Sequence, residues 1–171
     1  MSHYAAIKKT DIANGIGVRV SVFLSGCPIH CEGCFNYEAW NPSYGNPLTF
    51  AEQNEIMDAL QRPYIEGLSL LGGEPTASYN IECARFLARL AHAVGKTVWC
   101  YSGYTFEHLM QDERTRRFLH EIDVLVDGPY VKELSDITLL FRGSSNQRII
   151  DVPQSLHTNT IVLWDGCHAN H

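Results

Sequence analysis

The chain alternates between short apolar runs and segments in which apolar residues recur every three or four positions. The apolar runs cover residues 18–26, 67–73, 97–103 and 123–130, and the first three of them end in glycine. Runs of this length and composition predict buried β-strands. Residues 80–94 instead place apolar side chains at helical spacing, and Gly95 follows as a stop signal.

The intervening segments complete an α/β pattern. A helix is expected from Thr49, because Thr49 and Glu52 fit a capping box, and a second one over residues 105–122. Residues 141–150 predict a glycine–serine loop followed by a short strand, and residues 160–164 predict another strand. Strands that alternate with helices predict a parallel sheet with crossover helices.

Length limits how such a sheet is completed. The chain has 171 residues, which favours a single domain over residues 1–171. We expect its core at about 14–151 and leave the tail 152–171 without an assigned role. A closed eightfold barrel typically needs ~250 residues, so an incomplete, open parallel β/α barrel is expected instead.

Composition excludes some classes of function. Apolar residues make up 45% of the chain, charged residues 19%, and the net charge is −6. An acidic balance argues against nucleic-acid binding, which needs a basic surface. No apolar stretch approaches the ~20 residues that span a bilayer, and the amino terminus lacks the apolar run of a secretory signal. A cytoplasmic location is therefore expected, with no membrane partner.

The most informative stretch is SGCPIHCEGCFN at residues 25–36, directly after the first strand. Cys27, Cys31 and Cys34 can place three thiolates at three corners of a [4Fe–4S] cube, leaving one iron without a protein ligand. A structural zinc needs four ligands and would have to borrow one from a distant part of the chain. The spacing favours the cluster, but zinc stays open as an alternative.

Three other segments follow predicted strands as the cysteine loop does: GGEP after the second, YSGY after the third and VDGPY after the fourth. Ligand sites in parallel sheets lie at the carboxyl ends of the strands. These four segments are therefore expected to converge on one site.

The C-x-x-x-C-x-x-C loop resembles that of the radical S-adenosylmethionine (SAM) superfamily. Further stretches narrow the resemblance to the activating proteins of anaerobic ribonucleotide reductase, and they occur in the family's order from about Asn14 to Asp151. They are GVRVSVFLSGC, CEGCFN, EAW, LGGEP at 71–75, YSGYTFE at 101–107, VDGPY at 126–130 and FRGSSNQRIID at 141–151. Seven matches in order are far more specific than one.

The resemblance implies an oxidoreductase that binds SAM at the open iron of a [4Fe–4S] cluster. One electron from the reduced cluster would split SAM into methionine and a 5′-deoxyadenosyl radical. That radical would take a hydrogen atom from a glycine in a carboxyl-terminal loop of the large reductase subunit. A low-potential donor such as a flavodoxin is expected to supply the electron.

The resemblance also assigns residues. Cys27, Cys31 and Cys34 match the cluster ligands. Gly72, Gly73 and Glu74 match the segment that receives the SAM amino group, where a carboxylate would pair with an ammonium. Many radical SAM proteins have an aromatic residue just before the third cysteine. This chain has Gly33 there and Phe35 after Cys34, as in the activating-protein subgroup, so backbone groups from Gly33 to Phe35 are expected near the adenine.

Hydroxyl, amide and guanidinium groups at the ends of the later strands are further candidates for contacts with SAM or the partner: Ser102, Tyr104, Arg142, Ser144 and Asn146. Ordinary turn chemistry explains several of these residues equally well, because serine, glycine and asparagine are common turn formers. Both interpretations stay open at this point. Asp127 and Gly128 are read as a turn at the end of a strand.

Two alternative functions remain. Activators of other glycyl radical enzymes and small-molecule radical SAM enzymes share the loop and the glycine-rich segment. A non-catalytic, zinc-stabilised binding module would instead recruit a distant ligand, Cys83, Cys100, Cys167 or a histidine. We read Cys83 and Cys100 as core residues. The tail cluster of Cys167, His168 and His171, with His157 nearby, is read as a frayed terminus.

Overall fold

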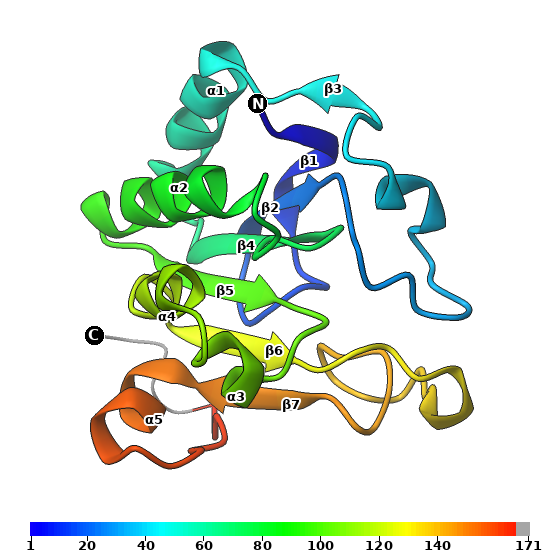
Figure 1. Cartoon of the computed structure of the whole chain (residues 1–171). Coiled ribbons are helices and arrows are strands. Elements are labelled where there is room, and N and C mark those ends of the chain that lie inside the picture. The colour runs from blue at the N-terminus through cyan, green and yellow to red at the C-terminus, as the bar shows by residue number, and fades with distance from the viewer. Residues whose placement is uncertain (167–171) are drawn as a thin grey trace.

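The structure, a computed structural model, describes residues 1–166 (Figure 1). Its strands are β1 His3–Asp11, β2 Arg19–Leu24, β3 Asn46–Pro47, β4 Gly67–Gly72, β5 Thr97–Tyr101, β6 Val124–Asp127 and β7 Arg148–Asp151. Its helices are α1 Phe50–Leu60, α2 Ile81–Ala93, α3 Phe106–Leu109, α4 Glu113–Leu119 and α5 Val152–Thr158, with single 3₁₀ turns η1 Tyr37–Trp40 and η2 Lys132–Leu134.

One mixed sheet of seven strands organises the chain, in the order β3-β1-β2-β4-β5-β6-β7. The four central strands, β2, β4, β5 and β6, are parallel, as the sequence predicts. The outer pairs are antiparallel. β3 and β7 form opposite edges, so the sheet is open. The fold class is mixed α/β, rather than purely parallel.

The two faces of the sheet are covered differently, because side chains alternate along a strand. Val98 and Cys100 of β5 point into the main core, where α1, α2, α3 and α4 pack. Trp99 and Tyr101 point to the other face, called here the second face, where a smaller apolar cluster lies. Figure 1 shows the helices gathered on one side of the sheet and the long loops projecting from the carboxyl ends of the central strands.

The capping box and the helix over 80–94 are confirmed, but the single helix expected over 105–122 is wrong. Thr49 and Glu52 bond each other's backbone as expected, and α2 ends just before Gly95. The segment 105–122 splits into α3 and α4, because the side chain of Asp112 accepts the backbone N–H groups of Arg114 and Thr115 and starts a new helix.

β7 departs from the expected parallel arrangement. The connection from β6 to β7 contains only the single turn η2, and a parallel return needs a crossover helix of about a dozen residues. β7 therefore returns directly alongside β6 in the antiparallel direction.

The chain ends also differ from expectation. β1 was not predicted, and its half-exposed residues owe their strand conformation to pairing with β2 rather than to an apolar run. The expected strand at 160–164 is wrong, because only a single bridge joins Leu163 to Ile150. α5 extends the fold beyond residue 151, with Val152 in the main core. Cys167, His168 and His171 lie outside the described residues. Among residues 1–166, no helix is long and apolar enough to cross a membrane.

Candidate functional site

The cysteine loop leaves the carboxyl end of β2 and is closed by backbone hydrogen bonds at its base. Gly26 N–H donates to the Ala39 carbonyl at 2.7 Å, and Cys27 N–H donates to the Trp40 carbonyl at 3.1 Å. His30 adopts a left-handed conformation (φ 53°) and stacks on Trp40 with ring centroids 4.5 Å apart. The loop is thus a defined structure, in which all three cysteines are partly buried.

The surroundings of Cys27 act on its thiol in two opposite ways. Burial raises the pKa of Cys27, while hydrogen bonds from the backbone N–H groups of Ile29 and His30 act to lower it. Because a metal or cluster binds the thiolate, N–H groups directed at the sulfur favour the bound form. The loop backbone therefore supplies donors suited to a ligated sulfur.

The donor set fits a cluster better than a single ion. Within residues 1–166, no three His, Cys, Asp or Glu side chains lie close enough together to hold one metal ion. Zinc needs its ligands to meet around one centre, whereas the irons of a cube take one thiolate each at separate corners. The loop supplies three thiols, which match three corners of a cube and are one ligand short of a tetrahedral zinc site.

The GGEP segment lies directly against the start of the cysteine loop. Gly73 N–H donates to the Leu24 carbonyl at 2.6 Å, and Glu74 N–H donates to the Gly26 carbonyl at 2.8 Å. A Cβ atom at position 73 would lie 2.3 Å from the Gly26 carbonyl oxygen, closer than any side chain tolerates. Glycine is required because two backbones meet here, and the expected convergence of the first two segments is present.

Glu74 joins the GGEP segment to the YSGY segment. Its carboxylate is fully buried, and burial raises its pKa. One oxygen accepts hydrogen bonds from Thr76 N–H, Thr76 Oγ1 and Ser102 Oγ at 3.0, 2.6 and 2.9 Å, and the other accepts Gly103 N–H at 2.8 Å. Four protein donors therefore occupy this carboxylate, so Glu74 holds two strand ends together. Its predicted contact with a SAM ammonium stays a prediction.

Replacing Glu74 by glutamine is expected to lower the free energy of unfolding by about 2 kcal/mol, because the new NH₂ group meets the N–H of Gly103 donor to donor in a buried site. Urea denaturation measures this loss. Glu82→Gln, at a side chain that is 64% exposed, is the matched control and should change stability by less than ~0.5 kcal/mol. Equal stability of the two variants would contradict the structural role of Glu74.

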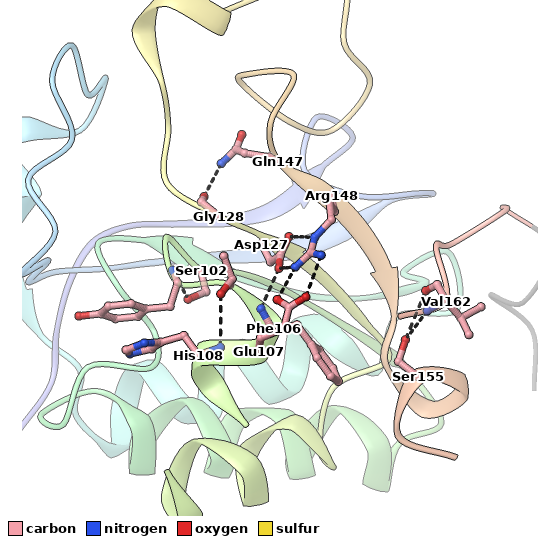
Figure 2. Close-up of polar contacts among 12 residues, drawn as sticks. Ser102, Phe106, Glu107, His108, Asp127, Gly128, Gln147, Arg148, Ser155 and Val162 are labelled. Carbon is pink, nitrogen blue, oxygen red and sulfur yellow. Dashed lines mark hydrogen bonds and ion pairs between the residues drawn. The ribbon is translucent and has the colours of Figure 1, made fainter. Parts of the chain in front are cut away.

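The fourth segment is held by the loop before β7, and Figure 2 shows the bond from Gln147 to Gly128. Gln147 Nε2 donates to the Gly128 carbonyl at 3.0 Å, and Asn146 Nδ2 donates to the Pro129 carbonyl at 2.8 Å. Ser144 is fully buried, and its Oγ accepts the Val131 N–H. Ser144 and Asn146 thus shape the loop itself. These bonds are consistent with turn chemistry, and contacts of the two residues with SAM or the partner stay a prediction.

A cavity of about 400 Å³ opens on the second face, between the cysteine loop and the β6–β7 connection. Its walls come from both loops, from the β1–β2 connection and from β5, and include Asn14, Cys34, Tyr101, Tyr130, Phe141 and Arg142. This volume is within the range of small-molecule sites. Of the candidate residues, Cys34, Phe35 and Arg142 line this cavity.

Arg142 faces this cavity with capacity to spare, whereas the Tyr101 hydroxyl is buried behind the cavity wall. Arg142 Nη1 donates to the Gln147 carbonyl at 2.6 Å, and its other N–H groups have no partner within residues 1–166. The buried hydroxyl of Tyr101 has no hydrogen-bond partner in the same range, and burial raises its pKa, so it remains a phenol donor. A cation among aromatic walls can hold a carboxylate-bearing, ring-containing molecule.

Two candidate residues lie elsewhere. Ser102 is buried and donates to Glu74, and Tyr104 stacks on His108 with ring centroids 4.7 Å apart. Tyr104 lines a separate cavity that also includes Pro28 and Tyr79. Four residues that line the Cys34 cavity were not predicted individually from the sequence: Asn14, Tyr101, Tyr130 and Phe141. For Tyr101 a signal was available, because its position two residues after Trp99 puts both on the same face of β5.

Comparisons with known proteins support the interpretation of the cysteine loop as an iron–sulfur cluster site. Residues 13–150 match the family described as a 4Fe-4S single cluster domain. The chain is 36% identical over 149 residues to the anaerobic ribonucleoside-triphosphate reductase-activating protein of Escherichia coli K12, covering 85% of this chain and 96% of that protein. The protein of the same name from Enterobacteria phage T4 is 38% identical over 164 residues, covering 95% and 97%.

A third relative, from Haemophilus influenzae, carries the same name and is 36% identical over 151 residues, or 86% of this chain and 96% of its own length. The matched cluster domain runs over nearly the same residues as the motifs found in the sequence, and the relatives are covered almost end to end. This chain belongs to the family of anaerobic ribonucleoside-triphosphate reductase-activating proteins.

Proposed function

We propose that this chain is a radical SAM activating enzyme that generates a glycyl radical on anaerobic ribonucleotide reductase. The observation that carries the proposal is the position of the cysteine loop. It lies at the carboxyl edge of the parallel strands, and Cys34 lines a cavity that also contains Arg142. Family membership and the match to a 4Fe-4S single cluster domain support the same function.

In this proposal Cys27, Cys31 and Cys34 each ligate one iron of a [4Fe–4S] cluster and leave the fourth iron for SAM. When bound, the cluster supplies the single electron that splits SAM, which allows a hydrogen atom to be taken from a glycine Cα of the reductase. A low-potential flavodoxin is the proposed source of that electron.

The chain's own residues bind and orient SAM. Arg142 pairs with its carboxylate. Gly72 and Gly73 let the end of β4 pack directly against the backbone of Leu24 and Gly26, which holds the GGEP segment beside the cysteine loop. Tyr130 and Phe141 form apolar walls that exclude water from the reacting groups.

The open sheet gives a partner protein access to the cavity. A glycine inside another protein can reach the cavity only if one side of the site is uncovered. The seven-stranded sheet, whose edges β3 and β7 do not meet, is proposed to be the incomplete barrel of a radical SAM enzyme. The partner is proposed to bind on the second face of this sheet.

Anaerobic reconstitution with iron and sulfide, followed by reduction and EPR spectroscopy, tests the proposal. We expect a cluster signal that changes when SAM is added, and a glycyl radical on the reductase large subunit when both proteins are mixed. A colourless protein that holds one zinc ion and is inert toward SAM would support the binding-module alternative. A radical that forms only on a different target protein would reassign the partner.

A further inference from the structure

Large apolar side chains are exposed around the mouth of the Cys34 cavity. Phe35, next to Cys34, is 99% exposed, and Ile137 in the β6–β7 connection is fully exposed. Leu140 and Leu134 of the same connection are 66% and 44% exposed. We call these four residues the apolar rim. Contiguous exposed apolar side chains mark interaction sites more often than chance surface residues do.

The two segments that carry the apolar rim lie side by side. Lys132 forms an ion pair with Glu32 of the cysteine loop, with 3.8 Å between the charged atoms. A Cβ atom at Gly33 would lie 3.2 Å from the Lys132 side chain. Phe35 and Leu139 line the same cavity. The rim is therefore continuous with the cavity, and Figure 1 shows both segments projecting from one edge of the sheet.

Hydrogen bonds within the β6–β7 connection keep the side chains of the apolar rim exposed. Asp136 N–H donates to the Gly143 carbonyl at 3.3 Å, and Ser145 N–H donates to the Leu134 carbonyl at 2.9 Å, so the connection folds back on itself. Phe141 takes a left-handed conformation (φ 59°), and its ring packs edge-on against Trp99 at 5.3 Å. Phe141 is thus anchored inward, while Ile137 and Leu140 are held outward.

We propose that the apolar rim is the docking surface for the reductase segment that carries the target glycine. This rests on the proposed function, because that function requires a backbone carbon of a second protein to reach the cavity beside Cys34. α1 and α2 cover the opposite face of the sheet, so a partner segment is expected to reach the cavity from the second face, where the rim lies beside the cavity. The occupant is an extended, glycine-containing segment flanked by apolar side chains.

The rim itself consists of exposed apolar side chains, and two of the charged residues beside it have partners within the protein. Lys132 is offset by Glu32 through the ion pair, and Asp136 Oδ1 accepts bonds from the N–H and hydroxyl of Thr138 within the connection. Burying two large apolar side chains at the centre of an interface typically changes affinity by tenfold or more.

The double variant Ile137→Asp with Leu140→Asp tests the rim, and Phe50→Asp with Phe86→Asp is its control. Phe50 and Phe86 are 81% and 44% exposed on α1 and α2, and the change in net charge is the same. We expect the rim variant to bind the reductase large subunit at least about tenfold more weakly than the wild type. SAM cleavage without the reductase should be unchanged, and the control should bind like the wild type.

Wild-type affinity in the rim variant, an equal loss in the control, or no binding of the wild type to the reductase would overturn the docking surface. Failure of the proposed function looks different: the wild type would not cleave SAM at all. A selective loss of affinity in the rim variant under those conditions would still support the docking surface.

Discussion

Replacing Cys31 by alanine is expected to abolish assembly of the iron–sulfur cluster. Each protein-bound iron of the proposed cube takes one thiolate, and the variant leaves only Cys27 and Cys34. Cys31 is also the middle of the loop, where its carbonyl accepts the Cys34 N–H at 3.1 Å. That backbone bond survives the substitution, so the loss isolates the thiolate. Iron and sulfide content and visible absorption after anaerobic reconstitution measure it.

Cys83→Ala is the matched control for this experiment. Cys83 lies on α2, and burial raises the pKa of its thiol, which disfavours the thiolate that iron binds. The control should assemble the cluster as the wild type does. Retained cluster and SAM cleavage in Cys31→Ala, or their loss in Cys83→Ala, would contradict the assignment of the loop as the ligand set.

The central fold follows from the sequence, because each central strand carries its own apolar signal. The runs around β2, β4, β5 and β6 are buried in a sheet, as their composition predicts. β1 lacks such a signal, since the exposed lysines of its second half obscure any alternation, and its conformation depends on β2. The break between α3 and α4 depends on one capping side chain, which a helical pattern alone does not reveal.

The site was predictable only as far as its segments carry local signals. Cysteine spacing and the paired glycines identify two converging segments from sequence alone. The hydrogen bonds that occupy the buried carboxylate of Glu74 were not predictable from the sequence. Its partners Ser102 and Gly103 are 28 and 29 residues away and are brought close by the β4–β5 pairing. Tyr101 and Phe141 line the cavity for a similar reason, because the fold brings together residues that are far apart in the sequence.

Replacing Arg148 by alanine is expected to lower the free energy of unfolding by about 3 kcal/mol, since removing one partner of a buried ion pair leaves the other charge uncompensated. Arg148 lies between Asp127 and Glu107, as Figure 2 shows. It donates to both oxygens of Asp127, at 3.0 and 2.6 Å, and to both oxygens of Glu107, at 3.0 and 2.7 Å.

The buried partner decides the size of this effect. Asp127 is only 1% exposed, and in the variant it keeps just the Phe106 N–H, at 2.7 Å, as a donor. For a domain of this size the loss corresponds to a melting temperature lower by about 6–12 °C. Calorimetry or thermal circular dichroism measures it. Glu107→Gln, at a side chain that is 57% exposed, leaves Asp127 paired and should lower the melting temperature far less.

The pH dependence of stability separates this ion-pair network from a general packing defect. Hydrogen bonding to Arg148 holds the pKa of Glu107 below its usual 4.5. A depressed carboxyl pKa stabilises the fold above the unfolded value, and that stability disappears as the pH falls through the folded value. The wild type should therefore lose part of its advantage over Arg148→Ala below about pH 4.5. A constant difference between the two proteins from pH 7 to pH 3 would show that Arg148 stabilises the β6–β7 pair by packing alone.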